Sequence, residues 1–238
     1  MKLLIIIPAY NEEKNIVRVV EHLRASVPQF DYVIVNDGSR DATGRLCREH
    51  GYPLVSLPVN LGLAGAVQAG MKYAMEHGYD AALQFDADGQ HRPEYIQPML
   101  DGMNEGADIV IGSRFVTEKK PRTLRMAGSN LISAAIRLTT GAKIKDPTSG
   151  MRLYNRRMIR ELATQINCAP EPDTISYFIL RGAHVKEIQV TMDERIAGAS
   201  YLNLTRSIGY MLRMGISILL MQWFRGREPF EEEKEAEK

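Results

Sequence analysis

Short apolar runs alternate with amphipathic stretches along the first half of the chain. The apolar runs contain few polar positions, as expected of strands that are buried on both faces. The stretches between them repeat apolar residues at helical spacing. The pattern predicts strands at Leu3–Ile7, Tyr32–Val35, Leu54–Leu57, Ala81–Phe85 and Ile109–Ile111, with helices at Glu13–Ser26, Ala42–His50, Leu63–His77 and Pro93–Asn104. This alternation predicts an α/β fold with a mostly parallel sheet and helices on both faces.

The turns that follow the predicted strands are polar and rich in glycine. They are Pro8–Glu13, Asn36–Asp41, Asn60–Gly65 and Asp86–Gln90. Ligands of such sheets bind outside the carboxyl ends of the strands, so these turns are the first candidates for a site. Helix capping accounts for one or two polar residues per turn. It does not account for two carboxylates flanking Ala87.

Asp86 and Asp88 suggest a site for a divalent cation. Two carboxylates that leave a strand at positions i and i+2 point the same way. Hard oxygen ligands of this kind suit Mg²⁺ or Mn²⁺, which commonly complete their shell with water and substrate phosphates. A lone D-x-D triplet is weak evidence, but its place after the fourth strand strengthens it. Neither a G-x-G-x-x-G dinucleotide turn after the first strand nor a G-x-x-x-x-G-K-[ST] loop is present.

Taken together, these segments resemble family 2 glycosyltransferases of the GT-A fold, which is Rossmann-like. The resemblance is strongest to the branch of dolichyl-phosphate mannosyltransferases and bacterial polyprenyl-phosphate glycosyltransferases. It extends over about residues 1–200, and the segments that carry it are Pro8–Glu13, Val35–Asp41, Asn60–Leu63, Asp86–Gln90 and Gly112–Phe115.

The resemblance implies roles for individual residues. The nucleotide-sugar site would comprise Pro8, Tyr10, Glu12, Asp37, Ser39, Asp86, Arg195 and Ser200. Asp86 and Asp88 would hold the metal, and Gln90 would face the sugar or the metal. The catalytic group would comprise Asp88, Gln90, Arg114, Asp146 and Arg152. Two alternatives stay open: Arg114 could form only a surface salt bridge, and the segment with Arg195 and Ser200 could be a polar connector.

The chemical class of the acceptor is inferred from whether the reaction needs a general base. A hydroxyl acceptor needs a base in a single inverting displacement, whereas a phosphate acceptor is already anionic and needs only cations to neutralise and aim it. The residues proposed to contact that phosphate are Arg114, Arg122, Arg125 and Arg152. Asp146 is a fallback base, although orienting the turn before Pro147 is the simpler role. Some relatives carry a carboxylate where Gly150 stands, and its absence favours phosphate. The basic segment after Arg114, which carries Lys119, Lys120, Arg122, Arg125 and Arg137, predicts a loop that enters an amphipathic helix at a membrane surface. A solvated loop followed by a core helix is the alternative.

The charge distribution supports a local basic patch. The chain has 238 residues and a formal net charge of +1. Residues 228–238 hold six Glu and two Lys, or −4, which leaves +5 on residues 1–227. Between Arg114 and Arg137 there are six Lys or Arg and one Glu. We expect no nucleic-acid partner. Cys47 and Cys168 have no metal-ligand spacing, so a disulfide framework or a zinc site is not predicted.

The end of the chain predicts an amphipathic helix from Asn203 to Phe224. Its apolar part, 214–224, would be ~16 Å long, too short for the ~30 Å hydrocarbon core. We therefore expect a helix lying at a membrane surface; a subunit-packing helix, and with it a homo-oligomer, is the alternative. The expected domains are 1–200 (catalytic), 201–227 (this helix) and 228–238 (a solvated acidic tail).

The sequence thus predicts a metal-dependent, inverting transferase that moves a sugar from a UDP- or GDP-linked donor to a polyprenyl phosphate. It would act at the cytoplasmic face of the membrane as a peripheral or monotopic protein. A same-fold enzyme acting on a hydroxyl is the nearest alternative. A nucleotidyltransferase is less favoured because such enzymes commonly have a Gly-rich N-terminal loop with a basic residue. A non-catalytic partner is disfavoured by the intact Asp86-Ala87-Asp88. Donor choice stays open among UDP-glucose, UDP-N-acetylglucosamine and GDP-mannose.

Overall fold

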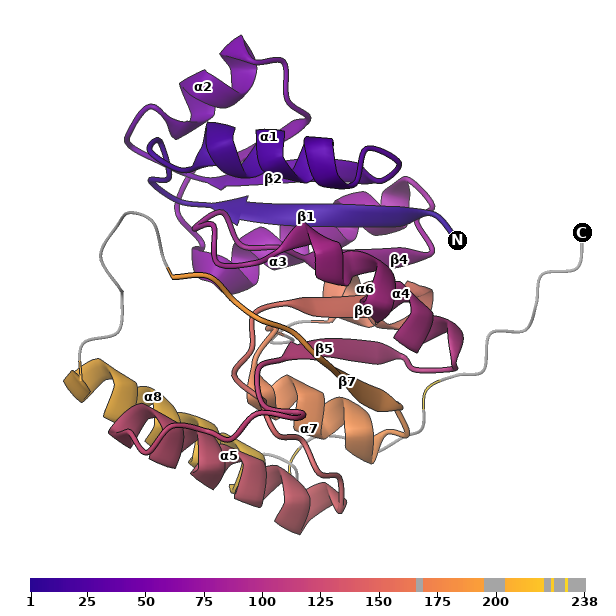
Figure 1. Cartoon of the computed structure of the whole chain (residues 1–238), viewed down its shortest axis with the longest axis vertical. Coiled ribbons are helices and arrows are strands. Elements are labelled where there is room, and N and C mark those ends of the chain that lie inside the picture. Colours follow the sequence, from indigo (N-terminus) through magenta and orange to yellow (C-terminus); the bar gives the residue numbers. More distant parts are fainter. Residues whose placement is uncertain (166–168, 195–203, 221–223, 225–229, 231–238) are drawn as a thin grey trace, which may run out of the picture.

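A mostly parallel sheet forms the centre of the molecule (Figure 1). The computed structural model describes residues 1–165, 169–194, 204–220, 224 and 230. Within these residues the sheet has seven strands in the order β3-β2-β1-β4-β6-β5-β7. Neighbours pair in parallel except β6, which is antiparallel to β4 and β5. The strands are β1 (Leu3–Ala9), β2 (Asp31–Asp37), β3 (Leu54–Leu57), β4 (Ala81–Gln84), β5 (Ile109–Ser113), β6 (Arg152–Asn155) and β7 (Val185–Gln189).

Helices cover both faces of the sheet, as the sequence predicts. One apolar core lies beneath α1 (Ile16–Ser26), α2 (Thr43–Glu49), the 3-10 turn η1 (Pro93–Tyr95) and α4 (Ile96–Asn104). The other lies beneath α3 (Gly62–Glu76), α5 (Leu124–Thr140), α6 (Arg156–Thr164), α7 (Pro172–Leu180) and α8 (Leu204–Leu220). Alternate residues of β1 contribute to the two cores, because successive side chains of a strand point to opposite faces. The predicted α/β fold class is confirmed.

The antiparallel strand β6 determines what gathers at the functional edge of the sheet. Because β6 runs opposite to its neighbours, its first residue lies beside the last residues of β4: Arg152 pairs with Gln84. The turn before β6, residues 146–151, therefore reaches the same edge as the segments that follow β4 and β5. The sequence predicts a site at this edge of the sheet but does not predict β6.

The final helix packs against its own chain. α5 and α8 lie side by side beyond β7, and α7 also contacts both (Figure 1). Met211, Met214 and Ile218 of α8 are buried in the core, whereas Leu212 and Ile216 are exposed. The helix thus carries apolar residues on a packed face and on an outer face. None of the helices among the described residues has the length and apolarity needed to cross a membrane.

The structure differs from the expected solvated tail at Phe230. Its side chain is buried and belongs to the same core as α7. Its ring lies edge-on to Phe178, with centroids 5.8 Å apart, and the Arg181 guanidinium carbon lies 4.0 Å from its centroid. Apolar burial and a cation–π contact therefore hold this one residue of an otherwise acidic segment. The acidic composition of residues 228–238 gives no indication that Phe230 is buried.

Candidate active site

A pocket of about 380 Å³ opens at the carboxyl ends of β1, β2 and β4. We call it the strand-end pocket. It includes most of the residues for which a nucleotide-sugar role was predicted. The lining consists of Pro8, Ala9, Tyr10, Glu12, Asp37, Asn60, Gly62, Leu63, Ala66, Asp86, Ala87 and Asp88. Sequence segments that are distant along the chain therefore meet here, as the order of the strands requires.

The loop after β1 is fixed to the loop after β2 by hydrogen bonds. The Asn11 backbone N–H donates to Ser39 Oγ (3.0 Å), and the Arg40 backbone N–H donates to Asn11 Oδ1 (2.9 Å). Asn11 has φ of 57°, a left-handed conformation that asparagine tolerates better than most residues. Ser39, for which a nucleotide contact was predicted, does not line the strand-end pocket. Its hydroxyl holds the two loops together.

Asp37 organises the next wall of the pocket. Its Oδ1 accepts a hydrogen bond from the Leu61 N–H (2.7 Å), and its Oδ2 accepts one from Asn60 Nδ2 (2.9 Å). A Cβ at Gly38 would lie 2.6 Å from the Asn60 backbone nitrogen, so glycine permits this close approach of the two loops. Asp37 therefore both lines the pocket and fixes the start of α3. The sequence analysis predicted only the first of these roles.

Asp86 and Asp88 both line the pocket, and their neighbours orient them. Gln84 Nε2 donates to Asp86 Oδ1 (3.0 Å), and the Gln90 N–H donates to Asp88 Oδ1 (3.0 Å). The Asp86 N–H donates to His91 Nδ1 (2.9 Å), and His91 Nε2 lies 3.7 Å from Asp86 Oδ2. Because Nδ1 accepts, the imidazole hydrogen belongs on Nε2, where it faces the carboxylate.

This pair suits a divalent cation. A Cβ at position 150 would lie 2.7 Å from Asp86 Oδ2, so Gly150 keeps the space beside that oxygen open. Among the residues that the structure describes, no group of three or more His, Cys, Asp or Glu could hold a metal. Two carboxylates alone would leave most coordination positions to water and phosphate oxygens, which is the usual arrangement for Mg²⁺ and related ions.

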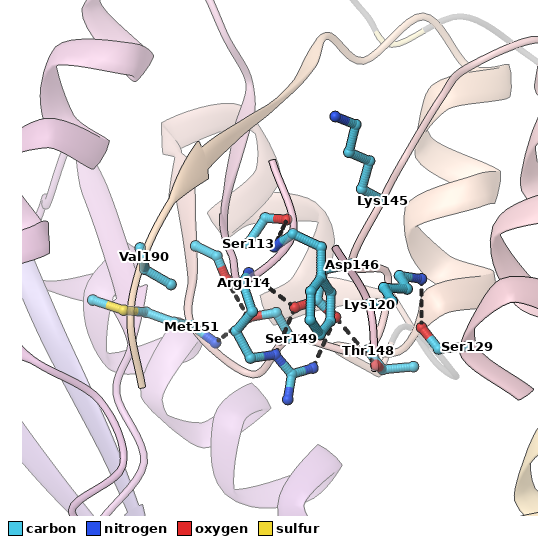
Figure 2. A network of polar contacts seen from close by, with 12 residues as sticks. Ser113, Arg114, Lys120, Ser129, Lys145, Asp146, Thr148, Ser149, Met151 and Val190 are labelled. Atoms are coloured by element: carbon cyan, nitrogen blue, oxygen red, sulfur yellow. Dashed lines mark hydrogen bonds and ion pairs between the residues drawn. The ribbon is translucent and has the colours of Figure 1, made fainter. Parts of the chain in front are cut away.

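Arg114 and Asp146 form the other half of the site (Figure 2). Arg114 Nε and Nη2 donate to the two oxygens of Asp146, at 2.7 and 2.8 Å, and the Arg114 N–H donates to the same carboxylate (3.1 Å). The Asp146 side chain is 0% exposed and the Arg114 side chain 25% exposed. Glu187 of β7 accepts from the Lys145 and Asp146 N–H groups, both at 2.7 Å. Asp146 therefore orients a partly exposed cation rather than facing solvent itself.

Arg152 is buried at the start of β6, just after the turn that contains Asp146. Its guanidinium donates to the Ser149, Pro170 and Pro147 carbonyls at 2.8, 2.6 and 2.7 Å. At 2% exposure it holds the turn before β6 together. The predicted contact of Arg152 with an acceptor phosphate would require these bonds to be exchanged, and the structure favours a structural role.

The remaining predicted residues have mixed outcomes. Gln90 lies beside Asp193: its Nε2 donates to the Asp193 carbonyl (3.3 Å), and Arg92 binds the Asp193 carboxylate. Arg122 is exposed just before α5. Arg125 lies in α5, but its side chain is outside the described part of the structure, as are Arg195 and Ser200 entirely. Their predicted contacts stay predictions.

Comparison with known proteins identifies the chain's family. The profile of "Glycosyl transferase family 2" matches residues 4–163. The chain belongs to glycosyl transferase family 2. Polyprenol monophosphomannose synthase of Mycolicibacterium smegmatis is 31% identical over 213 residues, covering 84% of this chain and 80% of that protein. Undecaprenyl-phosphate mannosyltransferase of Micrococcus luteus is 31% identical over 216 residues, covering 85% and 88%.

Solved structures give the same fold for this family 2 glycosyltransferase. Glucosyl-3-phosphoglycerate synthase of Mycobacterium tuberculosis, in complex with Mn²⁺, UDP and glucosyl-3-phosphoglycerate, superposes with a TM-score of 0.65. The two chains are 20% identical, and the match covers 93% of this chain and 79% of the other. The predicted GT-A architecture is therefore confirmed.

The sequence did not indicate three residues of the candidate site: Gln84, His91 and Glu187. Gln84 carries a signal, since it is the polar residue inside the apolar run Ala81–Phe85. His91 follows the Asp86–Gln90 segment directly, but a single histidine does not reveal which atoms it contacts. Glu187 lies in a strand that was not predicted.

Proposed function

We propose that this glycosyltransferase moves a sugar from a nucleoside-diphosphate sugar, UDP- or GDP-linked, to the phosphate of a polyprenyl phosphate, with inversion at C1. The observation that carries this proposal is the state of Asp146. Both of its oxygens accept from Arg114, and it is fully buried. Asp146, the fallback candidate for a general base, is thus already paired with the Arg114 guanidinium. An acceptor phosphate is already anionic and needs no base. The names of the two relatives, a polyprenol monophosphomannose synthase and an undecaprenyl-phosphate mannosyltransferase, support the same acceptor.

The chemistry divides between the two halves of the site. Mg²⁺ or Mn²⁺ bound by Asp86 and Asp88 would offset the negative charge of the donor diphosphate. The strand-end pocket would hold the nucleoside with Tyr10, Glu12 and Asp37. Arg114 would align an acceptor phosphate oxygen with C1 of the sugar. That oxygen forms the new bond to C1, the C1–oxygen bond of the donor breaks, and the nucleoside diphosphate leaves with the electron pair.

The acceptor lipid requires access to a membrane, and the exposed apolar residues of α5 and α8 supply a candidate contact. Leu131 and Leu138 of α5, together with Leu212 and Ile216 of α8, are exposed. We propose that this face rests on the cytoplasmic surface of the membrane. Truncating α8 would be a poor test, because its buried face stabilises the fold. Leu212→Gln with Ile216→Gln preserves that face and should weaken vesicle binding.

A matched pair of lipids tests the acceptor. The purified full chain is incubated with Mn²⁺, a panel of UDP-glucose, UDP-N-acetylglucosamine and GDP-mannose, and either undecaprenyl phosphate or undecaprenol. The phosphate should yield an acid-labile lipid-linked sugar identified by mass spectrometry, and the alcohol should yield none. Transfer to the alcohol at a comparable rate, or to a glycan hydroxyl only, would refute the proposal.

A further inference from the structure

A second cavity, of about 670 Å³, lies beside α5. We call it the α5 cavity. It shares no lining residue with the strand-end pocket. Three segments line it: the residues after β5, one side of α5, and the residues before Asp146. The lining consists of Phe115, Val116, Thr117, Glu118, Lys119, Lys120, Asn130, Ser133, Ala134, Arg137, Lys143, Ile144 and Lys145.

The lining of the α5 cavity is strongly cationic. It holds five Lys or Arg side chains and one acid, Glu118. Lys120 is partly buried, and burial lowers the pKa of its ammonium group. Its Nζ donates to Ser129 Oγ (3.1 Å) and lies 5.6 Å from the centre of the Phe115 ring. The cavity therefore concentrates positive charge, part of which is already removed from water.

Neutral groups of the lining point to a ligand that accepts hydrogen bonds. The Ser133 Oγ atom is buried and has no hydrogen-bond partner among the described residues. A rotation of the Ser133 side chain toward the cavity would let this hydroxyl donate to a ligand oxygen, which would offset the cost of burying it without a partner. Asn130 precedes Ser133 by about one helical turn and adds an amide to the same wall. Hydroxyl, amide and cations together match a phosphate group.

The surroundings favour a phosphate that belongs to a lipid. Leu131 and Leu138 of α5 are exposed, each about 100° around the helix from a lining residue, Asn130 or Arg137. An acyl chain that leaves the cavity across the outer surface of α5 would meet these apolar side chains. Lys145 lines the cavity, and its backbone N–H donates to Glu187, which also accepts from the Asp146 N–H. The wall of the cavity is thus continuous with the residues that orient Arg114.

We propose that the α5 cavity binds the phosphate of an anionic phospholipid headgroup. This ligand is distinct from the sugar acceptor, which we place at Arg114, and the inference does not depend on which sugar is transferred. Bound there, the lipid would anchor α5 at the membrane and brace the 143–146 segment next to the active site. An anionic membrane surface attracts basic residues generally. The test must therefore distinguish lipid binding in the α5 cavity from a general attraction between basic surface residues and anionic lipids.

Vesicle binding of the full chain, without donor or polyprenyl phosphate, provides that test. Vesicles of phosphatidylcholine alone are compared with vesicles of equal parts phosphatidylcholine and phosphatidylglycerol. We expect binding to the anionic vesicles to be about tenfold tighter. Arg137→Glu with Lys143→Glu should abolish this preference. Arg18→Glu with Lys72→Glu, exposed positions on α1 and α3 with the same change of charge, should retain it. If the two double variants lost the preference for anionic vesicles to the same extent, the proposal would be overturned.

A variant that fills the cavity without altering charge makes the test sharper. Ala134 is exposed on the lining, so Ala134→Phe should fold and occupy the cavity. The ratio of the two vesicle affinities should then fall to about one, whereas a diffuse basic surface would leave the ratio unchanged and overturn the proposal. Glycerol 3-phosphate is the soluble form of the same chemistry. If it bound alone as tightly as the anionic vesicles, the lipid would not be the ligand.

Discussion

The two halves of the active site use carboxylates in opposite ways. In the strand-end pocket, Asp86 and Asp88 face the cavity, and their neighbours orient them toward it. On the other half, which comprises Arg114, Asp146 and Glu187, the carboxylate of Asp146 is turned inward and fixes a cation. The first half therefore presents carboxylates to the pocket, whereas the second exposes part of the Arg114 guanidinium. The same residue type lines the pocket as a pair in the first half and is buried against a guanidinium in the second.

The comparison is tested most strongly by removing one charge from the first half. Asp88→Asn should lower the transfer rate by about a hundredfold or more, because a metal ligand that opposes the donor diphosphate is lost. Isothermal titration with Mn²⁺ should show weaker binding, and circular dichroism should show an intact fold. Asp101→Asn, an exposed residue of α4, is the matched control. A loss within about tenfold of the wild-type rate would contradict the metal role.

In the second half of the site, the effects of substitutions on transfer and on the free energy of unfolding should be separable. Arg114→Ala leaves Asp146 buried without its partner, which should lower the free energy of unfolding by about 3 kcal/mol and abolish transfer. Arg114→Ala combined with Asp146→Asn removes the buried charge and should regain most of that stability while transfer stays lost. Denaturant unfolding and a transfer assay of the three variants check this. If the double variant recovered activity, Arg114 would not aim the acceptor.

A smaller effect is expected at Asp37. Asp37→Ala should raise the donor KM about tenfold and lower kcat less, since contacts to the nucleoside are made equally in the ground and transition states. Asp37→Asn keeps an oxygen for the Leu61 N–H and should lie between the alanine variant and wild type. Steady-state kinetics at varied donor concentration measures both constants. A lower kcat at unchanged KM would contradict a contact between Asp37 and the nucleoside.

The sequence predicted the first half of the site better than the second. Each predicted strand there has an apolar run followed directly by its functional residues, so position in the fold follows from order along the chain. The second half depends on β6 and β7. β6 is four residues long with Arg and Asn at its ends, and all five residues of β7 are partly exposed. Neither has the pattern that marks a buried strand.

Hydrogen-bond partners were also beyond the reach of the sequence. Ser39 and Arg152 have the residue types expected of ligand contacts, yet one joins two loops and the other binds three carbonyls. A polar residue near a site can bind a ligand or support the loop that does. Which role it takes depends on backbone groups that fold against it from distant segments, and residue type does not encode those.

The smallest expected effect concerns His91, which supports Asp86 without facing the donor. His91→Leu removes the acceptor of the Asp86 N–H and the imidazole group near Oδ2, so the Mn²⁺ dissociation constant should rise several-fold, up to about tenfold for one lost buried hydrogen bond. His91→Asn restores an acceptor close to the position of Nδ1 and should recover part of that affinity. Isothermal titration of Mn²⁺ without substrates measures the effect directly, and the unfolding free energy of each variant reports the structural cost separately. A purely structural histidine would lower stability and leave Mn²⁺ affinity unchanged in both variants. Recovery by asparagine would instead show that the first carboxylate of the pair binds the cation well only when its backbone is held in place.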